Sequence, residues 1–545
     1  MGFRGESEKQ TVLHAGAVDA HRDINLAAYI HRAARAYPAR VALSWEGGER
    51  RYADLSQRID ALAAGFDSLG VRAGDRVVIL LSNGSRWIET YFAAVQLGAI
   101  AVPLLTRLVA REFQYLLGDA DPCLIVTERA REELLGSVSL PAGCRVLWSD
   151  APASATDSLD AVESRGRKLA PVRPRIDLQS PASILYTSGT TGQPKGTVRS
   201  QQSACFIIPI RQAVMGIGPD TTLLATTPMF HAAGHEFMMF QTLAAGGRVV
   251  SRSQFSEDDV AELVDRERIT HAFFVPTMAA RLLPAIRRRG TGWPSLSLWC
   301  SAAAPLPAQL RDDIRAAVPA ARLWNVYGVT EAGVASYLRD DAIDSKSGTC
   351  VGLAGPGAVL RVVDESGADV APGVIGEVIL QSAEAMSGYW KRAEESAQTL
   401  RDGWVHSGDL GTLDDDGYLY VVGRIKDMVI TGGENVYAAE VENVLSRTPG
   451  VHEITIIGVP HPVWGEAVVA LAVVAPGAGD VQSEVLETAR AELAAHKRPK
   501  RVLVVESLPK NSFGKVDKQV LRQQHAALMI ETPHATALSR GEPNG

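Results

Sequence analysis

The sequence predicts an α/β fold: a large N-terminal region of layered α/β subdomains, followed by a small α+β domain. The 545 residues exceed what one hydrophobic core accommodates, so more than one domain is expected. Short apolar runs rich in β-branched residues alternate with helical stripes over roughly the first 400 residues, which is typical of layered α/β structure. Beyond Gly423 the elements become short and mixed. We therefore assign residues 1–425 to an N-terminal domain, 426–531 to a C-terminal domain and 532–545 to a flexible polar tail.

The N-terminal elements begin with two amphipathic helices. Asn25 precedes an apolar stripe that ends at Pro38, and Asp54 is expected to cap a second stripe, which Gly70 closes. Apolar runs then predict buried parallel strands, with helical patterns between them. The strands are expected at residues 76–81, 100–104, 123–127, 222–226, 248–250 and 271–275, with a helix at 258–267. Residues 151–180, rich in Ala, Ser, Asp, Arg and Pro, are expected to form a mostly surface connection between two parts of this region.

The C-terminal elements are five in number and short. We expect helices at residues 438–446 and 483–495, and strands near 454–459, 468–474 and 501–505. Five short elements in one stretch of about 120 residues are typical of a small α+β domain.

Composition argues against several classes of function. The net charge of −7, without any long run of Lys or Arg, argues against binding to nucleic acid. Five cysteines lie far apart without CxxC spacing, which argues against a disulfide framework or a zinc site. The N-terminus lacks the apolar core of a signal peptide, and no run reaches the ~18 apolar residues of a membrane span. The sequence therefore predicts a cytoplasmic protein.

A loop rich in hydroxyls and glycines follows an apolar strand pattern at residues 184–186. Its glycines let backbone N–H groups approach phosphate oxygens, its hydroxyls donate hydrogen bonds and its lysine supplies positive charge. It is not a P-loop, because its lysine falls three residues after a glycine and precedes another glycine. A flexible surface loop is the alternative. The residues expected to bind ATP here are Thr187, Ser188, Gly189, Thr190, Thr191, Gly192 and Lys195.

This loop resembles the signature motif of the ANL superfamily, which comprises acyl-CoA and aryl-CoA synthetases, adenylation domains of peptide synthetases, and luciferases. Four further stretches resemble the superfamily's other motifs, in the same order along the chain. They are NVYGVTE at 325–331, WVHSGD at 404–409, GRIKD at 423–427 and PKNSFGK at 509–515. The resemblance extends over residues 28–521, nearly the whole chain.

The resemblance implies roles for the nucleotide-site residues. Glu331 would hold Mg²⁺ against the phosphates of ATP, since a hard cation takes oxygen ligands. Thr330 would hydrogen-bond the α-phosphate, and Tyr327 would bind the nucleotide. Asp409 would accept both ribose hydroxyls, with Arg424 donating nearby.

The resemblance also implies that the small domain rotates between two half-reactions. Lys515 would be the catalytic lysine, whose ammonium stabilises the charge that develops as the substrate carboxylate attacks the α-phosphate. Lys426 stands at the position of the family's hinge residue, where a few residues absorb a large backbone change. A β-turn in a rigid interface is the alternative for this position.

The expected acyl acceptor is coenzyme A. By the resemblance, Gly432 and Gly433 belong to the segment used in thioester formation, Trp464 would stack on the CoA adenine, and Arg498 would contact the CoA phosphates. An exposed Trp beside a basic patch also suits an acidic acyl carrier protein, which remains the alternative acceptor.

The acyl pocket is assigned to three stretches by the same resemblance. The first, residues 228–235, resembles the family segment in which a histidine or aromatic side chain gates the pocket, so His231 is the expected gate residue. Ala232 stands where peptide-synthetase domains place an Asp for the substrate ammonium, which argues against an α-amino acid. His231 and His235 are four residues apart, but the HExxH pattern of a zinc site is not matched. Arg199-Ser200-Gln201 replaces a Thr-His or Ser-His pair common in relatives. The expected pocket residues are Phe230, His231, Ala302, Ala303, Gly328 and Val329.

The sequence therefore predicts an ATP-dependent acid–thiol ligase. It would activate a hydrophobic carboxylic acid as acyl-AMP with release of pyrophosphate, then transfer the acyl group to coenzyme A, using ATP and Mg²⁺. One alternative is adenylation alone, with delivery to a carrier protein or a separate transferase. A luciferase-like oxygenase shares the first half-reaction, and a non-catalytic paralogue is disfavoured because the charged motif residues are all present. The acid and the oligomeric state, a homodimer included, are left open.

Overall fold

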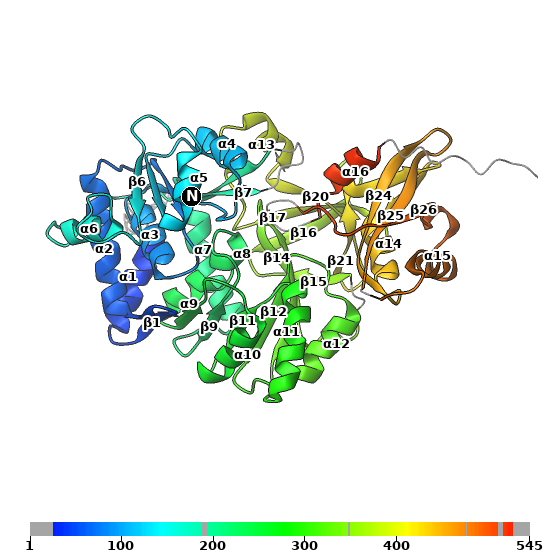
Figure 1. The fold of residues 1–545 in the computed structure, drawn as a ribbon, viewed down its shortest axis with the longest axis horizontal. Coiled ribbons are helices and arrows are strands. Elements are labelled where there is room, and N and C mark those ends of the chain that lie inside the picture. Colours follow the sequence, from blue (N-terminus) through cyan, green and yellow to red (C-terminus); the bar gives the residue numbers. More distant parts are fainter. Residues whose placement is uncertain (1–24, 188–192, 347–348, 476, 511–515, 527–545) are drawn as a thin grey trace, which may run out of the picture. The chain divides into compact units, whose positions relative to one another are not determined.

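The chain forms two compact units, each assembled from several segments. The computed structural model describes residues 25–187, 193–346, 349–475, 477–510 and 516–526 (Figure 1). The first unit comprises Met1–Leu104, Gln114–Leu185 and Val198–Gln254, and the second comprises Leu105–Phe113, Tyr186–Thr197 and Phe255–Gly545. The predicted boundary at residue 425 falls inside the second unit and stays a prediction.

The first unit contains a parallel sheet in the order β6-β5-β3-β4-β7. Nearly every residue of β3, β4 and β5 is buried, as expected for strands covered on both faces. The strands are β3 (Arg76–Leu80), β4 (Ile100–Pro103), β5 (Leu124–Thr127), β6 (Arg145–Trp148) and β7 (Pro181–Thr187). The elements that lie between these strands in the chain, or directly after β7, are α3 (Ser85–Gln96), α4 (Ala110–Ala120), α5 (Glu132–Gly136), β8 (Lys195–Ser200) and α7 (Gln201–Met215).

A second run of strands in the first unit has the order β9-β10-β1-β2. Its pairs are parallel except for the β1–β2 hairpin. The strands are β1 (Val41–Trp45), β2 (Gly48–Arg51), β9 (Thr222–Ala225) and β10 (Arg248–Ser251), with helices α8 (Ala232–His235) and α9 (Met239–Ala245) between the last two.

The two predicted N-terminal helices are present, with one correction. In α1 (Leu26–Ala36) the Asn25 side chain accepts a hydrogen bond from the Ala28 backbone N at 3.1 Å, so Asn25 is the N-cap as predicted. Asp54 is not a cap: α2 (Tyr52–Ser68) begins two residues earlier and Asp54 lies in its first turn. The Tyr52 ring is fully buried and its hydroxyl donates to two backbone carbonyls, so tertiary contacts extend the helix.

Residues 151–180, the expected connection, lie mostly at the surface, but they also contain a helix that was not predicted. This stretch contains α6 (Leu159–Gly166), which packs on α2 and buries Leu159 and Val162. Contact is so close that a Cβ on Gly166 would lie 1.8 Å from the carbonyl oxygen of Ala61. Only a glycine permits this approach, which the composition of the segment did not reveal.

In the second unit, the sheet begins with parallel strand pairs and continues with antiparallel pairs. The pairs β11–β12 and β12–β13 are parallel, whereas each later pair in the order β13-β14-β15-β21-β20-β17-β16 is antiparallel. The sequence did not predict this antiparallel stretch. The strands of this sheet in the second unit are β11 (His271–Phe273), β12 (Leu298–Ala302), β13 (Arg322–Val329), β14 (Gly333–Leu338), β15 (Cys350–Ala354), β16 (Ala358–Val363), β17 (Gly376–Ser382), β19 (Leu400–Arg401), β20 (Trp404–Leu413) and β21 (Leu419–Arg424). The short strand β18 (Gly388–Tyr389) instead pairs with β8.

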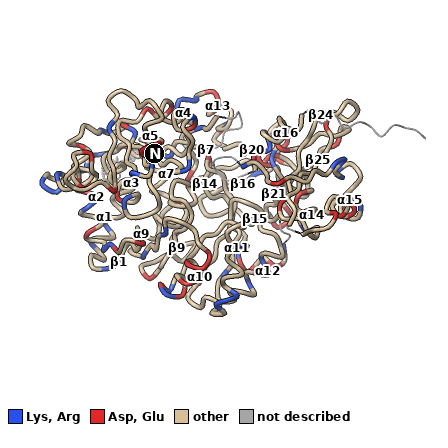
Figure 2. The backbone as a smooth tube through the Cα atoms, in the orientation of Figure 1, with Lys and Arg blue, Asp and Glu red and all other residues tan. Residues whose placement is uncertain are grey.

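Helices of the second unit carry mixed charge on their surfaces. Figure 2 shows basic and acidic residues side by side along α10 and α12, where Arg266 pairs with Glu262 and Arg315 with Asp340. The helices are α10 (Glu257–Arg266), α11 (Pro276–Arg289), α12 (Ala308–Ala317) and α13 (Ala393–Thr399). In the part of the chain that the structure describes, none of the helices combines the length and apolar character needed to cross a membrane.

The C-terminal segment of the second unit has its own sheet, in the order β23-β22-β25-β24, with β26 parallel to β25. Its core packs α14 and α15 on the sheet through Val441, Leu445, Ile456, Val468 and Val485. The five predicted elements are present within a few residues, whereas β22, β23 and α16 were not predicted. The bounds are β22 (Met428–Thr431), β23 (Glu434–Tyr437), α14 (Ala438–Leu445), β24 (Val451–His461), β25 (Gly465–Val474), α15 (Val481–Glu492), β26 (Arg501–Val504) and α16 (Lys518–His525).

Candidate active site

Two predicted ATP-site residues lie at strand ends that flank the hydroxyl- and glycine-rich loop. Thr187 ends β7 and Lys195 begins β8. The residues between them that were assigned to phosphate binding, Ser188 to Gly192, lie outside the described part of the chain. The Lys195 ammonium lies 5.3 Å from the ring centroid of Tyr389, a cation–π distance. Next to it, the Gly196 carbonyl accepts a hydrogen bond from the Trp390 backbone N at 2.7 Å.

Thr330 and Glu331 lie at the tip of the β13–β14 hairpin. The turn is tight, because a Cβ on Gly328 would lie 2.2 Å from the carbonyl oxygen of Gly333. The Glu331 side chain is half-buried, and its Oε1 accepts a hydrogen bond from the Tyr389 hydroxyl at 2.8 Å. The Glu331 backbone is held as well, since its carbonyl accepts from the Met386 N at 2.8 Å.

Tyr389 therefore contacts two predicted site residues that lie far apart in the sequence, Lys195 and Glu331. Sequence reasoning missed it, although the aromatic pair Tyr389-Trp390 after Gly388 was a visible signal. Burial, and then the negative charge of Glu331, raise the pKa of the Tyr389 hydroxyl. The hydroxyl is thus a stable hydrogen-bond donor to the carboxylate.

Asp409, Arg424 and Tyr327 are brought together as a second cluster. Asp409 and Arg424 are direct partners across the antiparallel β20–β21 pair, and their side chains meet at 3.0 Å. The Tyr327 hydroxyl, on β13, donates to the other carboxylate oxygen at 2.7 Å. Asp409 is only 4% exposed, so these donors compensate the burial of its charge. Burial and Asp409 raise the pKa of Tyr327 well above its usual value.

The donor set fits a magnesium–nucleotide complex. Mg²⁺ is usually held by one or two carboxylates together with substrate phosphates, rather than by an all-protein cage. Glu331 would provide such a carboxylate and Lys195 a positive charge for phosphate, and the buried Asp409 carboxylate could accept from hydroxyls. Among the described residues, no group of three or more His, Cys, Asp or Glu is placed to hold a metal by itself.

Phe230 and His231 lie in the first unit, in the segment between β9 and α8. Their rings are 4.3 Å apart, and both side chains are half-buried. Asn83 fixes the backbone before them: its amide donates to the Thr227 carbonyl at 3.0 Å and accepts from the Met229 N at 2.8 Å.

The gate residue His231 is also held from behind by His235. The His235 Nδ1 lies 2.8 Å from the His231 carbonyl, which can only accept, so Nδ1 carries the proton. His235 is fully buried among Trp87, Tyr91 and Phe240, and burial lowers its pKa. The imidazole is therefore neutral and braces the gate backbone.

The unusual Arg199 has a partner in the same segment. Its guanidinium forms a buried ion pair with Glu236 at 3.2 Å, at the end of α8. Arg199 and Glu236, the acid next to His235, thus form a pair, whereas the sequence indicated no role for Arg199.

The remaining predicted acyl residues lie in the second unit. Ala302 ends β12, Ala303 follows it with a φ of +69°, and Gly328 and Val329 end β13. Since Phe230 and His231 belong to the first unit, a shared acyl pocket stays a prediction.

Three of the predicted CoA residues lie at neighbouring hairpin turns. Gly432 and Gly433 form the two-residue turn of the β22–β23 hairpin, both with positive φ, as a type I′ turn requires. The Gly432 N donates to the Trp464 carbonyl at 2.8 Å. The Trp464 ring stacks on His461 at 4.3 Å, and the Lys500 ammonium lies 5.0 Å from its centroid.

Arg498 and Lys426 are not part of this group of contacts. The Arg498 guanidinium donates to the carbonyls of Leu493 and Arg490, at the end of α15. Lys426 lies in a short 3₁₀ turn, Ile425–Asp427, that connects β21 to β22. Lys515 lies outside the described residues. The roles of all three stay predictions.

Family profiles match most of the chain. The profile described as AMP-binding enzyme matches residues 30–390, and the profile of the AMP-binding enzyme C-terminal domain matches residues 440–515.

Individual proteins match over nearly their whole length. A feruloyl-CoA synthase of Amycolatopsis sp is 35% identical over 92% of this chain and 99% of its own. An indoleacetate–CoA ligase of Aromatoleum aromaticum is 33% identical, over 92% and 98%. A fatty acid–[acyl-carrier-protein] ligase, ScoC, of Streptomyces coeruleorubidus is 31% identical, over 89% and 94%. The crystal structure of ATP-bound MatB from Rhodopseudomonas palustris has a TM-score of 0.83 at 30% identity, covering 93% of this chain and all of that one.

Proposed function

Because this chain belongs to the AMP-binding enzyme family and is an ATP-dependent acid–thiol ligase, we propose that it activates an aromatic carboxylic acid and transfers it to coenzyme A. The observation that carries the nucleotide half of this proposal is the buried Asp409 carboxylate, with Arg424 on one oxygen and Tyr327 on the other. Each oxygen keeps a further lone pair, so a vicinal diol such as that of ribose can donate to both.

The first half-reaction joins the acid to AMP. A carboxylate oxygen attacks the α-phosphorus of ATP, and the bond to the bridging oxygen of pyrophosphate breaks. In our proposal Lys195 holds the phosphate charge and Glu331 provides the carboxylate for Mg²⁺, which screens the negative charge of the phosphates when bound. Thr330 and Lys515 keep the roles that the sequence assigned to them.

The second half-reaction transfers the acyl group to a thiol. The sulfur of CoA attacks the acyl carbon, the thiol proton is lost, and the carbon–oxygen bond to AMP breaks, leaving a thioester. Trp464 supports CoA as acceptor, since an aromatic platform beside a cation suits an adenine and its phosphates. The Trp464 ring contacts His461 and the Lys500 ammonium, which also donates to the Ala495 carbonyl at 3.4 Å, so a base that stacks on Trp464 would replace one of these two contacts.

An aromatic acid fits the residues of the gate segment. The position that would hold a substrate ammonium is Ala232, and the side chains at the gate are the rings of Phe230 and His231. The relatives named for feruloyl-CoA and indoleacetate act on aromatic acids. A carrier protein as acceptor is the second candidate, because the relative ScoC is named for that acceptor.

The test is a panel of cinnamic, indolic, benzoic and long-chain acids, assayed with and without CoA for pyrophosphate release and thioester. We expect thioester from an aromatic acid, and only when CoA is present. Thioester from the long-chain acids alone would contradict the aromatic assignment. Pyrophosphate release without thioester would indicate that the acceptor in the second half-reaction is a carrier protein instead of CoA.

A further inference from the structure

We propose that Tyr389 is a positioning residue that orients Glu331 toward Mg²⁺ and Lys195 toward phosphate. The proposal rests on the proposed function, because it takes the roles of Glu331 and Lys195 from there. Tyr389 itself was not assigned by the sequence.

The first part of the argument is the hydrogen bond to the carboxylate. A carboxylate on a hairpin tip can rotate, and a metal ligand needs a fixed orientation. The Tyr389 hydroxyl donates to Oε1 of Glu331 at 2.8 Å, so that oxygen is held in place. Oε2 of Glu331 receives no hydrogen bond from Tyr389 and remains available to a cation.

The second part is the face of the ring. The Lys195 ammonium lies 5.3 Å from the ring centroid, so its charge is held by an aromatic face. One side chain therefore contacts both the predicted metal ligand and the predicted phosphate ligand. Its ring and its hydroxyl have separable functions.

The third part is the rigidity of the tyrosine itself. Its backbone N donates to Ser396 Oγ at 2.8 Å, and this oxygen donates to the Arg392 carbonyl at 2.5 Å, which ties β18 to α13. The next residue, Trp390, donates to Gly196 beside Lys195. Tyr389 is thus fastened to the strand that begins with Lys195, and a positioning residue needs such support.

The experiment separates the hydroxyl from the ring. ATP binding to the full-length wild type, Tyr389→Phe and Tyr389→Leu is measured by isothermal titration calorimetry, without Mg²⁺ and over a series of Mg²⁺ concentrations. Pyrophosphate exchange is measured over the same series with an accepted acid. Tyr389→Phe keeps the ring beside Lys195 and removes the donor to Glu331, whereas Tyr389→Leu removes both.

We expect Tyr389→Phe to bind metal-free ATP like the wild type. Its gain in ATP affinity on adding Mg²⁺ falls about tenfold, because a charge-assisted hydrogen bond is lost. The Mg²⁺ concentration for half-maximal exchange rises in proportion. Tyr389→Leu shows the same loss and also binds metal-free ATP more weakly.

The matched control is Tyr420→Phe. It removes a hydroxyl that donates to Asp414 at 3.0 Å, a tyrosine–carboxylate pair of the same kind with no assigned role. We expect it to leave the Mg²⁺ dependence unchanged.

The outcomes distinguish this proposal from the proposed function. The role of Tyr389 is overturned if Mg²⁺ increases the ATP affinity of Tyr389→Phe as much as that of the wild type, even if adenylation proceeds. It is also overturned if Mg²⁺ does not increase the ATP affinity of the wild type. If Mg²⁺-dependent binding responds as expected but no acid in the panel yields an adenylate, the proposed function fails and the role of Tyr389 stands. An equal fall in rate for both variants, with no change in the Mg²⁺ midpoint, would reduce Tyr389 to a structural residue.

Discussion

At the scale of single residues, the backbone conformation of Ala303 lowers the stability of the folded chain. Its φ of +69° lies in the left-handed region, which costs an L-residue with a Cβ about 1–2 kcal/mol. The sequence assigned Ala302 and Ala303 to the acyl pocket without indicating their backbone conformation. The structure shows that Ala303 stands where the backbone favours glycine.

We therefore expect Ala303→Gly to stabilise the protein by about 1 kcal/mol, since relief of the left-handed strain exceeds the entropic cost of glycine. The measurement is urea unfolding followed by tryptophan fluorescence. Ala304→Gly is the control: Ala304 has no positive φ, so the same change there should be neutral or destabilising. Equal effects at both positions would contradict the strain argument.

Arg199 and Glu236 show a second residue-scale effect. A buried arginine is tolerated only with a partner, and the acid that pairs with it lies 37 positions further along the chain. In the sequence, Arg199 is only a departure from the Thr-His or Ser-His pair of relatives. The structure shows that it forms an ion pair with Glu236, in the segment that contains His231.

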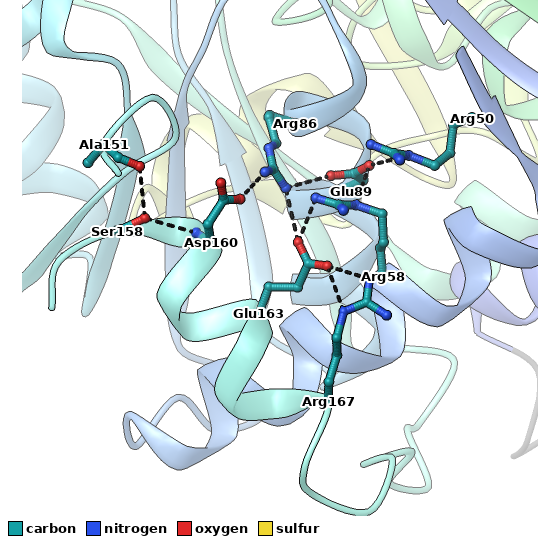
Figure 3. A network of polar contacts seen from close by, with 9 residues as sticks. All are labelled: Arg50, Arg58, Arg86, Glu89, Ala151, Ser158, Asp160, Glu163 and Arg167. Carbon is teal, nitrogen blue, oxygen red and sulfur yellow. Dashed lines mark hydrogen bonds and ion pairs between the residues drawn. The ribbon is translucent and has the colours of Figure 1, made fainter. Parts of the chain in front are cut away.

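At the scale of elements, α6 is held by a network of ion pairs. Figure 3 shows Arg58 and Arg86 between the carboxylates of Glu89 and Glu163, with Arg167 on the outer side of Glu163. Glu89 accepts from Arg58 at 2.9 Å and from Arg86 at 3.1 Å, and Glu163 lies 3.2 Å from Arg86. Both carboxylates are buried. Helix α6 is therefore fastened to α2 and α3 by charge as well as by close packing.

We expect Glu163→Gln to destabilise the protein by about 3 kcal/mol, because it removes a buried carboxylate that pairs with Arg58, Arg86 and Arg167. Thermal or urea unfolding measures the loss. Glu262→Gln is a matched control, since it breaks an exposed ion pair of the same i,i+4 spacing, Arg266–Glu262, and should cost less than about 1 kcal/mol. A Glu163→Gln variant as stable as this control would show that the network contributes little.

The turn between β24 and β25 contains Trp464, the residue proposed to stack on the adenine of CoA. Trp464→Ala should raise the KM for CoA about tenfold, the loss expected when an adenine loses an aromatic platform, while pyrophosphate exchange is spared. Steady-state thioester assays at varied CoA measure it. Trp464→Phe, which keeps an aromatic face, should recover most of the affinity. An unchanged KM for CoA in the alanine variant would refute the stacking role.

At the scale of the whole molecule, the two half-reactions are expected to depend on different residues. Lys515→Ala should lower adenylate formation by roughly 100-fold or more, since a preorganised charge at the reacting phosphate is lost. Thioester formation from supplied acyl-AMP should remain largely intact. Lys510→Ala is the control. The Lys510 ammonium forms an ion pair with Glu453 at 3.1 Å, so we expect this variant to change neither step. Equal loss of both half-reactions in the Lys515 variant would refute its assigned role.

The predicted family and fold class are confirmed by the two family profiles and by the TM-score of 0.83 to ATP-bound MatB. The motif residues stay assigned by resemblance, and the structure brings two groups of them into contact. Asp409, Arg424 and Tyr327 form one group, and Gly432 and Trp464 form another.

The sequence by itself determined the α/β class, the buried strands such as β3, the cap at Asn25 and the family. These follow from patterns within a few consecutive residues, because hydrophobic periodicity, capping and short motifs are local. Only the tertiary structure decided the position of α6, the antiparallel pairing after β13, and the partners of Arg199 and Tyr389. Each of these depends on contacts between residues far apart in the chain, such as Lys195, Glu331 and Tyr389, and no local pattern encodes which distant side chains will meet.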